Sequence, residues 1–300
     1  MKTYIALVRH GVTEWNYDAR AQGHSDIPLS DEGRYQAEAV GARLRMERWD
    51  ALYSSDLSRA VSTARAIGRH TGHEVLIDSR LRERNIGLAE GTTQHERQLR
   101  WPGVPWNSLP GLEPHEELAR RAMDALTEIA RRHEGERVIV VSHGALIAAF
   151  LREITAGNSR VGIPRNTGIT PILYDGERFT PAGPHEFRHL LVDGVEYTGE
   201  KGRLLYEATR TGLPGIRLEA NEAEPFVLNA TAVESAWVDD RLVGYARLFS
   251  DQVRAGYVDY VETLPEYQRV RPVLIQRLER RFPGVQLELL GSSLEERSGA

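Results

Sequence analysis

Apolar positions in the first two-thirds of the chain follow two alternating spacings, one typical of buried strands and one typical of amphipathic helices. Short apolar runs predict strands at residues 4–8, 51–54, 75–77, 137–141 and 169–174. Apolar residues three and four apart predict helices at residues 31–48, 56–71, 116–133 and 145–154. Because strands and helices alternate, we expect a three-layer α/β/α sandwich around a mostly parallel sheet.

Two local features refine this pattern. Ser30 precedes a pair of acidic residues and is predicted to be the N-cap of the helix at 31–48. Residues 92–112 are rich in Pro, Gly and Trp, which indicates an irregular excursion between two regular elements.

The alternation fades after about residue 190, and glycines mark a loose boundary at 194, 199, 202, 212 and 215. Beyond it, the pattern predicts strands at 227–237, 242–249, 257–262 and 285–290, with one helix at 271–281. The polar end, 292–300, is expected to fray. We therefore predict two domains: 1–192 is the larger, and 193–300 is a smaller α+β domain.

Composition narrows the function classes. The 300 residues carry a formal net charge of −5 and include no cysteine. Mild acidity argues against nucleic-acid or membrane-surface partners, and the absence of cysteine excludes disulfides and thiolate chemistry. The apolar start is too short for a signal peptide, and the run at 138–151 is too short to span a bilayer. These features predict a cytoplasmic protein.

The strongest candidate chemistry is RHGVTEWN at residues 9–16, directly after the first predicted strand. Ligand sites in open α/β sheets form outside the C-terminal ends of strands. A neutral imidazole nitrogen of His10 can attack phosphorus, and Arg9 offers a planar fork that suits phosphate oxygens. Thr13 and Asn16 either add hydrogen bonds to the phosphate or only shape the loop.

Three further segments place suitable side chains at the ends of other predicted strands. Residues 54–60 set Arg59 near the start of a helix, and residues 81–87 supply Glu83 as a proton donor. Residues 141–144 set His143 at a helix N-terminus, where anions are favoured. These side chains are expected to converge with Arg9 and His10 on one pocket.

These motifs, with the loop QGHSDIPLS at 22–30, resemble the histidine phosphatase superfamily of phosphoglycerate mutase-like fold. The resemblance covers roughly residues 1–190. It implies that His10 is the nucleophile, that Glu83 protonates the leaving oxygen, and that the phosphoryl group is bound by Arg9, Arg59 and His143. It also implies a small phosphorylated metabolite as substrate, with neither a metal nor another cofactor. The substrate-binding residues are then Thr13, Asn16, Gln22, Gly23 and Gly144.

Several positions allow two interpretations. Glu90 is a second carboxylate near Glu83 and is the next candidate for the proton donor. Asn166 either faces the site or forms a turn. Trp101 and Trp106 either line the mouth of the pocket or hold a loop in place. The other histidines lack metal-ligand spacing and are interpreted as surface or packing residues.

The superfamily contains both phosphatases and mutases. The short stretch between Glu83 and His143 leaves room for only a small lid, which admits water and favours hydrolysis. A phosphoglycerate mutase-type phosphotransferase is the first alternative. A phosphoester-binding regulatory protein with little turnover is the second.

The C-terminal domain resembles, faintly, the acyl-CoA-binding half of a GNAT acetyltransferase. The resemblance rests on the predicted hairpin at 237–248 and on LPEYQ at 264–268. A pyrophosphate cradle needs glycines next, but QRVRPV at 268–273 brings side chains and a proline. We therefore expect a non-catalytic module that packs on the catalytic domain or forms a homodimer.

Overall fold

The computed structural model describes residues 1–157, 162–192, 194–210, 213, 220–238, 241–250, 255–283 and 285–289. The chain divides into two compact units, of which the first contains Met1–Trp15 and Arg20–Leu190. The second contains Asn16–Ala19 and Leu191–Ala300. The predicted frayed end at 292–300 lies outside the described residues.

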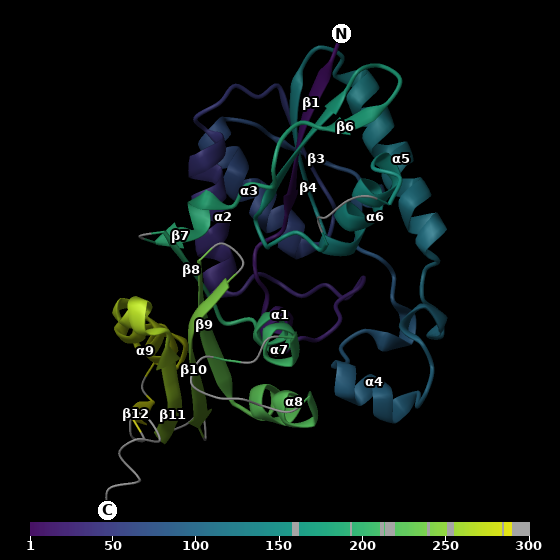
Figure 1. The fold of residues 1–300 in the computed structure, drawn as a ribbon. Helices are drawn as coiled ribbons and strands as arrows, with labels where there is room; N and C mark the ends of the chain where they lie inside the picture. The colour runs from purple at the N-terminus through teal and green to yellow at the C-terminus, as the bar shows by residue number, and fades with distance from the viewer. Residues whose placement is uncertain are drawn as a thin grey trace, which may run out of the picture. The chain divides into compact units, whose positions relative to one another are not determined.

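The first unit is built on a mixed, mostly parallel sheet with the strand order β3-β2-β4-β1-β5-β6 (Figure 1). Strands β1 to β4 run parallel to one another, whereas β5 is antiparallel to β1 and β6 is antiparallel to β5. The bounds are β1 (Thr3–Arg9), β2 (Ala51–Ser54), β3 (Val75–Ile77), β4 (Arg137–Ser142), β5 (Ile169–Tyr174) and β6 (Phe179–Pro181).

Helices cover both faces of this sheet, as Figure 1 shows. Along β1, Ile5 and Leu7 pack with α5 (His115–Arg132) and α6 (Gly144–Ile154). The intervening Ala6 and Val8 pack with α2 (Asp31–Leu44) and α3 (Ser58–Thr71). Because successive strand residues point to opposite faces, one strand supports two cores. The predicted three-layer fold class is confirmed, and Ser30 caps α2 by accepting a hydrogen bond from the N–H of Gly33.

The excursion at 92–112 contains more regular structure than its composition indicates. It includes α4 (Gln94–Arg100) and the 3-10 turn η3 (Trp106–Ser108). Thr93 and Glu96 form a reciprocal capping box at the start of α4. The prediction of an irregular segment was wrong here because this cap signal was passed over. The remaining short elements are α1 (Glu14–Tyr17), η1 (Ser79–Leu81), η2 (Gly87–Ala89) and η4 (Arg188–Leu190).

The second unit is a largely antiparallel sheet with the order β12-β11-β10-β9-β8-β7, in which only the β11–β12 pair of the described strands is parallel. Helices α7 and α8 pack on one face and α9 packs on the other. The bounds are β7 (Leu191–Val192), β8 (Val195–Thr198), α7 (Lys201–Arg210), α8 (Ala220–Leu228), β9 (Ala232–Val238), β10 (Arg241–Ser250), β11 (Ala255–Thr263), η5 (Pro265–Val270), α9 (Arg271–Arg281) and β12 (Gln286–Leu289).

Two expectations for this unit were wrong in part. The loose boundary segment contains β8 and α7, whose buried Leu204 and Ala208 are spaced for one helix face. The strand predicted at 227–237 begins too early, because Val227 belongs to α8 and packs there with Ala223. Within the described residues, no helix is long and apolar enough to cross a membrane.

Candidate active site

The predicted chemistry gathers at the C-terminal ends of the parallel strands. The N–H of His10, after β1, donates to the carbonyl of Ser142 at the end of β4 (2.9 Å). The N–H of Ser55, after β2, donates to the carbonyl of Val141 (3.0 Å). Hydrogen bonds between parallel strands therefore bring the loops that follow β1, β2 and β4 to one edge of the sheet.

His10 is buried, and its ring orientation follows from one contact. Its Nδ1 lies 2.7 Å from the carbonyl oxygen of Gly11. A carbonyl can only accept, so Nδ1 carries the proton and Nε2 keeps a free lone pair. Burial, and then the charges of Arg59 and Arg9, hold the pKa of His10 well below its usual value. The imidazole is therefore neutral, which is the form a nucleophile requires.

His143 lies beside it, with the two ring centroids 5.1 Å apart. Its Nε2 is 2.9 Å from the hydroxyl oxygen of Ser55, which also accepts from the N–H of Leu57 (3.3 Å). The hydroxyl proton is then best directed to Nε2, which places the imidazole proton on Nδ1. That Nδ1 is buried with no partner among the described residues. Burial, followed by the charge of Arg59, holds the pKa of His143 well below its usual value.

Arg59, in the first turn of α3, is fully buried. Its terminal nitrogens donate to the carbonyls of Ser25 (2.7 Å) and Gly23 (2.8 Å). Its Nε has no partner in the part of the chain that the structure describes, and desolvation lowers the pKa of Arg59 to about 10. The guanidinium thus stays cationic at neutral pH while one buried donor is unsatisfied. A buried unpaired donor beside neutral imidazoles is a site prepared for an anion.

Gly23 has a positive φ of 54°, and a Cβ at this position would lie 2.4 Å from a carboxylate oxygen of Glu90. That carboxylate accepts from the N–H of His24 (2.8 Å) and from the hydroxyl of Ser25 (2.5 Å). Glu90 therefore holds the same loop whose carbonyls orient Arg59.

Arg9 and Gly144 lie next to each other in the site. The Nη1 of Arg9 donates to the carbonyl of Pro164 (2.8 Å), so the chain returning towards β5 orients this guanidinium. A Cβ on Gly144 would lie 2.6 Å from Ile163 and 3.3 Å from the Nε of Arg9. Asn166 is buried and donates from Nδ2 to the carbonyl of His10 (2.8 Å). Asn166 therefore positions the backbone of the predicted nucleophile.

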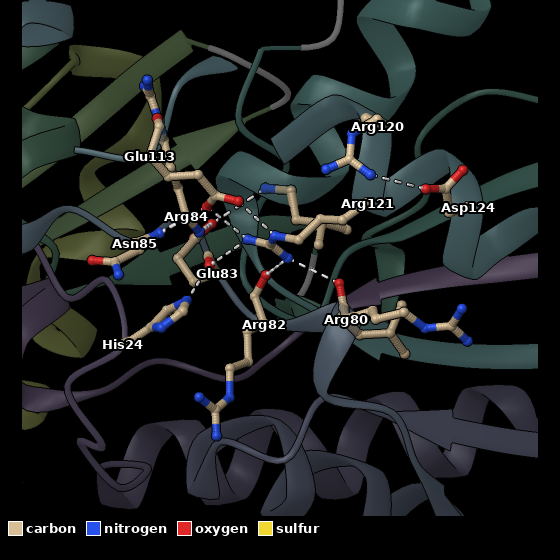
Figure 2. A network of polar contacts seen from close by, with 12 residues as sticks. His24, Arg80, Arg82, Glu83, Arg84, Asn85, Glu113, Arg120, Arg121 and Asp124 are labelled. Atoms are coloured by element: carbon tan, nitrogen blue, oxygen red, sulfur yellow. Dashed lines mark hydrogen bonds and ion pairs between the residues drawn. The ribbon is translucent and has the colours of Figure 1, made fainter. Parts of the chain in front are cut away.

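Glu83 is the fifth predicted catalytic residue and lies in the segment before η2. Its carboxylate accepts from the N–H groups of Arg84 (2.8 Å), Ala145 (3.1 Å) and Leu146 (3.2 Å), two of which start α6. The carboxylate is thus held at the helix end that follows His143. Figure 2 shows the backbone of Glu83 at the centre of a polar network formed with His24, Arg121 and Glu113.

The remaining predicted substrate-binding residues are Thr13, Gln22 and Asn16. Thr13 is buried and its backbone bridges to Leu29. The Oε1 of Gln22 is buried without a partner among the described residues. Asn16 is half-buried in α1 and groups with the second compact unit, apart from the unit that holds His10. The contacts thus assemble the five predicted catalytic residues within the first unit, whereas Asn16 is assigned to the second.

Trp101 and Trp106 line a cavity of about 590 Å³ in the excursion. Arg97 stacks over the ring of Trp106 (4.9 Å) and also lines this cavity. None of the predicted catalytic residues lines this cavity, but Trp106 also lines a second cavity of about 430 Å³ together with Arg84, Ala145 and Ile163. Trp106 therefore borders the residues whose N–H groups bind the Glu83 carboxylate, whereas Trp101 lines the cavity of the excursion. In the described part of the chain, no group of three or more His, Asp or Glu side chains is arranged to hold a metal ion.

Sequence reasoning gave no role to Ser55, His24 or Arg121. Ser55 was visible within the segment at 54–60, but its bond to His143 spans 88 positions. His24 was interpreted as a surface or packing residue, yet its Nε2 donates to the carbonyl of Glu83 (2.8 Å). Arg121 reads as an ordinary charged residue of an amphipathic helix, and no local signal distinguishes it.

The chain is similar in sequence to known proteins. The family model of the histidine phosphatase superfamily (branch 1) matches residues 5–183. A Bacillus subtilis (strain 168) protein, named uncharacterized phosphatase PhoE, is 37% identical over 179 residues, which are 59% of this chain and 91% of that protein. The metal-independent phosphoserine phosphatase of Arabidopsis thaliana is 41% identical over 168 residues, which are 52% of this chain and 71% of that protein.

Solved structures agree with the sequence relatives. A mycobacterial glucosyl-3-phosphoglycerate phosphatase, solved as a complex with VO3, superposes with a TM-score of 0.56 at 28% identity, covering 61% of this chain and 99% of that one. Other similar proteins are named probable phosphoglycerate mutases. The family match covers more than half of the chain, and the chain therefore belongs to branch 1 of the histidine phosphatase superfamily.

Proposed function

We propose that this protein is a phosphatase that hydrolyses a small phosphomonoester through a phosphohistidine at His10. One observation carries the proposal: the Nδ1 proton of His10 is directed to the carbonyl of Gly11, so a neutral Nε2 lone pair remains beside Arg9 and Arg59. Burial keeps this nitrogen unprotonated, while the two guanidinium groups supply the positive charge that a phosphate dianion needs.

The proposed reaction has two displacements. In the first, Nε2 of His10 attacks phosphorus, the bond from phosphorus to the ester oxygen breaks, and Glu83 gives its proton to that leaving oxygen. In the second, water attacks phosphorus, the P–N bond breaks, and the water proton passes to the Glu83 carboxylate. Inorganic phosphate leaves and both side chains return to their starting forms.

The unsatisfied donors fit roles in phosphoryl binding. The Nε of Arg59 and the Nδ1 of His143 are both buried without partners among the described residues. A phosphoryl oxygen between them would satisfy both and would gain strength from the low dielectric of the site. Arg9 would add a further cation, and the close approach permitted by Gly144 suits bound phosphate.

Hydrolysis is preferred to mutase chemistry because the excursion between η2 and α5 is short. A mutase must keep its phosphorylated intermediate from water while the substrate turns round, whereas a small lid admits water. A phosphotransferase of the mutase type and a phosphoester-binding protein with little turnover are the two alternatives.

A turnover screen of the full chain against small phosphomonoesters, phosphoserine and phosphoglycerates included, tests the proposal directly. We expect release of inorganic phosphate, competitive inhibition by vanadate and no effect of EDTA. Isomerisation of phosphoglycerate without phosphate release would favour the mutase. Vanadate binding without turnover of any ester would favour the regulatory protein.

Replacing Glu83 by Gln tests the proton donor. We expect a loss of about 100-fold or more in kcat/KM for alkyl phosphates, whose leaving alkoxide needs a proton. The loss with p-nitrophenyl phosphate should be much smaller, because p-nitrophenolate leaves readily without one. Equal losses on both substrates would move the role elsewhere, and Glu90 would be tested next.

For the C-terminal part, we propose a domain starting at residue 193 that is GNAT-like in outline but non-catalytic. The parallel pair β11–β12 is joined through α9, which gives a β-α-β unit. The entry to α9 passes through η5, and Val270 is fully buried there. Pro272 follows and lacks an N–H. A dimer through this domain and a cytoplasmic location are part of the same proposal.

A further inference from the structure

Arg121 is a residue of α5 whose guanidinium contacts the segment that carries Glu83 rather than the phosphate site itself. Its Nη1 donates to the carbonyls of Arg80 (2.9 Å) and Arg82 (2.6 Å), and its Nη2 donates to the carbonyl of Glu83 (2.8 Å). The same side chain forms a forked ion pair with Glu113, at 2.7 Å and 2.9 Å. These contacts use all five N–H donors that a guanidinium has.

Figure 2 shows Arg121 between Glu113 and the backbone of the segment that carries Glu83. The side chains of Arg121 and Glu113 are 19% and 12% exposed, so the pair is shielded from solvent screening. Burial alone would raise the pKa of Glu113, but hydrogen bonds from Arg121 and from the N–H of Asn85 hold it below its usual value. Glu113 stays ionised and keeps the fork of Arg121 in one orientation.

We call the hydrogen bonds from Arg121 to these three carbonyls the clamp. The clamp holds the backbone, and the position of the backbone determines where the Glu83 carboxyl lies. Three carbonyls at 80, 82 and 83 converge on one guanidinium, which restricts this stretch to a single course. His24, in the loop that follows α1, adds a second hydrogen bond to the carbonyl of Glu83. A shift of about 1 Å in a catalytic group can cost about 100-fold in rate.

We infer that Arg121 is a positioning residue for proton transfer, which fixes the segment 80–83 so that the Glu83 carboxyl meets the leaving oxygen. This inference rests on the proposed role of Glu83. Lysine cannot replace arginine here, because an ammonium has three donors and no planar fork. Loss of the clamp should therefore impair protonation of the leaving group more than nucleophilic attack by His10.

The test compares kcat/KM for an alkyl phosphate and for p-nitrophenyl phosphate in the full chain, since kcat/KM includes the steps up to departure of the leaving group. For Arg121→Lys we expect a loss of about tenfold or more with the alkyl phosphate. With p-nitrophenyl phosphate we expect less than about threefold. Glu113→Gln should change the ratio of the two values in the same direction.

Arg120 supplies the matched control. It neighbours Arg121 on α5, but its side chain is 71% exposed and its ion pair with Asp124 is 3.5 Å long. Arg120→Lys should leave both kcat/KM values unchanged. Equal losses on both substrates in Arg121→Lys, or no loss on either, would overturn the inference.

Two further variants separate failure of the inference from failure of the proposed function. If Glu83→Gln shows no dependence on the leaving group, the assigned proton donor is wrong and the inference falls with it. If Glu83→Gln loses more activity with the alkyl phosphate than with p-nitrophenyl phosphate and Arg121→Lys does not, only the inference is wrong. In the double variant Glu83→Gln/Arg121→Lys we expect no further selective loss on the alkyl phosphate, because the group to be positioned is gone. Should Arg121→Lys fail to fold, Glu113→Gln decides the question by the same ratio.

Discussion

The imidazoles of His10 and His143 are buried at the C-terminal ends of parallel strands of the first sheet. The same surroundings hold both of them neutral. Burial contributes most to their lowered pKa values, and the charge of Arg59 comes next for both. A protonated imidazole would lack the lone pair needed for attack and would repel the two guanidinium groups. The environment of His10 and His143 thus favours binding of an anion over protonation of the rings.

At this scale the first prediction concerns His10→Ala. We expect turnover to fall below detection, because no other described side chain presents an unprotonated nitrogen at this position. The substitution removes buried atoms but no core hydrophobe, so far-ultraviolet circular dichroism and the urea midpoint should show a folded chain. Turnover within tenfold of the parent protein would contradict the phosphohistidine mechanism.

The second prediction is a pH dependence of stability. Unfolded histidine has a pKa of about 6.5, whereas the folded pKa values of His10 and His143 lie well below it. Below pH 6.5 the unfolded chain therefore binds protons that the folded chain does not, and the free energy of unfolding falls as the pH falls. This stabilising contribution is complete above that pH and is lost progressively on acidification.

Urea unfolding at pH 7.5 and pH 5.5 measures this effect. In His10→Gln, the decrease in unfolding free energy between the two pH values should be smaller than in the parent, since one such group is gone. An identical decrease in both proteins would show that His10 titrates alike in the folded and unfolded chains.

At the scale of elements, the loop after α1 and helix α3 act together. The carbonyls of Gly23 and Ser25 orient Arg59, and Glu90 holds their loop through His24 and Ser25. The loop is therefore a structural support for the guanidinium of Arg59, which we propose binds the phosphoryl group.

Glu90→Ala is predicted to weaken vanadate binding by about tenfold, because loosening the loop lets Arg59 leave its bound orientation. The losses in kcat/KM for alkyl and aryl phosphates should be equal, in contrast with Glu83→Gln. Steady-state inhibition with both substrates distinguishes the two carboxylates. A loss restricted to alkyl phosphates would make Glu90 the proton donor.

On the scale of the whole molecule, each unit has its own apolar interior. The two large clusters of the first unit consist of residues of that unit alone, and the two clusters of the second unit likewise contain only its own residues. The apolar interiors therefore divide along the same line as the two compact units.

Acetyl-CoA is predicted not to bind to the full chain with a micromolar dissociation constant. Phosphate cradles use successive free N–H groups close to the ligand, but Pro272 removes one donor near the start of α9 and neighbouring side chains add bulk. Isothermal titration calorimetry measures this binding. A micromolar constant would indicate a second active site in this unit.

Much of the fold was predictable because its signals are local. The strands 51–54 and 75–77 and the helix 271–281 have the bounds that their apolar spacing predicts. Errors arose where composition outweighed spacing, as in the Pro-rich and Trp-rich excursion that contains α4, or where a helix and a strand lie close together, as around Val227.

The sequence by itself determined the main alternating strands and helices of the first unit, the family and the side chains placed after the parallel strands, because these depend on spacing and short motifs. Only the tertiary structure decided which ring nitrogen of His143 is held by Ser55, that Glu90 supports a loop, and that Arg121 clamps the segment of Glu83. Such contacts join residues far apart in the chain, and a hydrogen bond requires its partners within about 3 Å and in line. That geometry exists only after the sheet has brought the loops together.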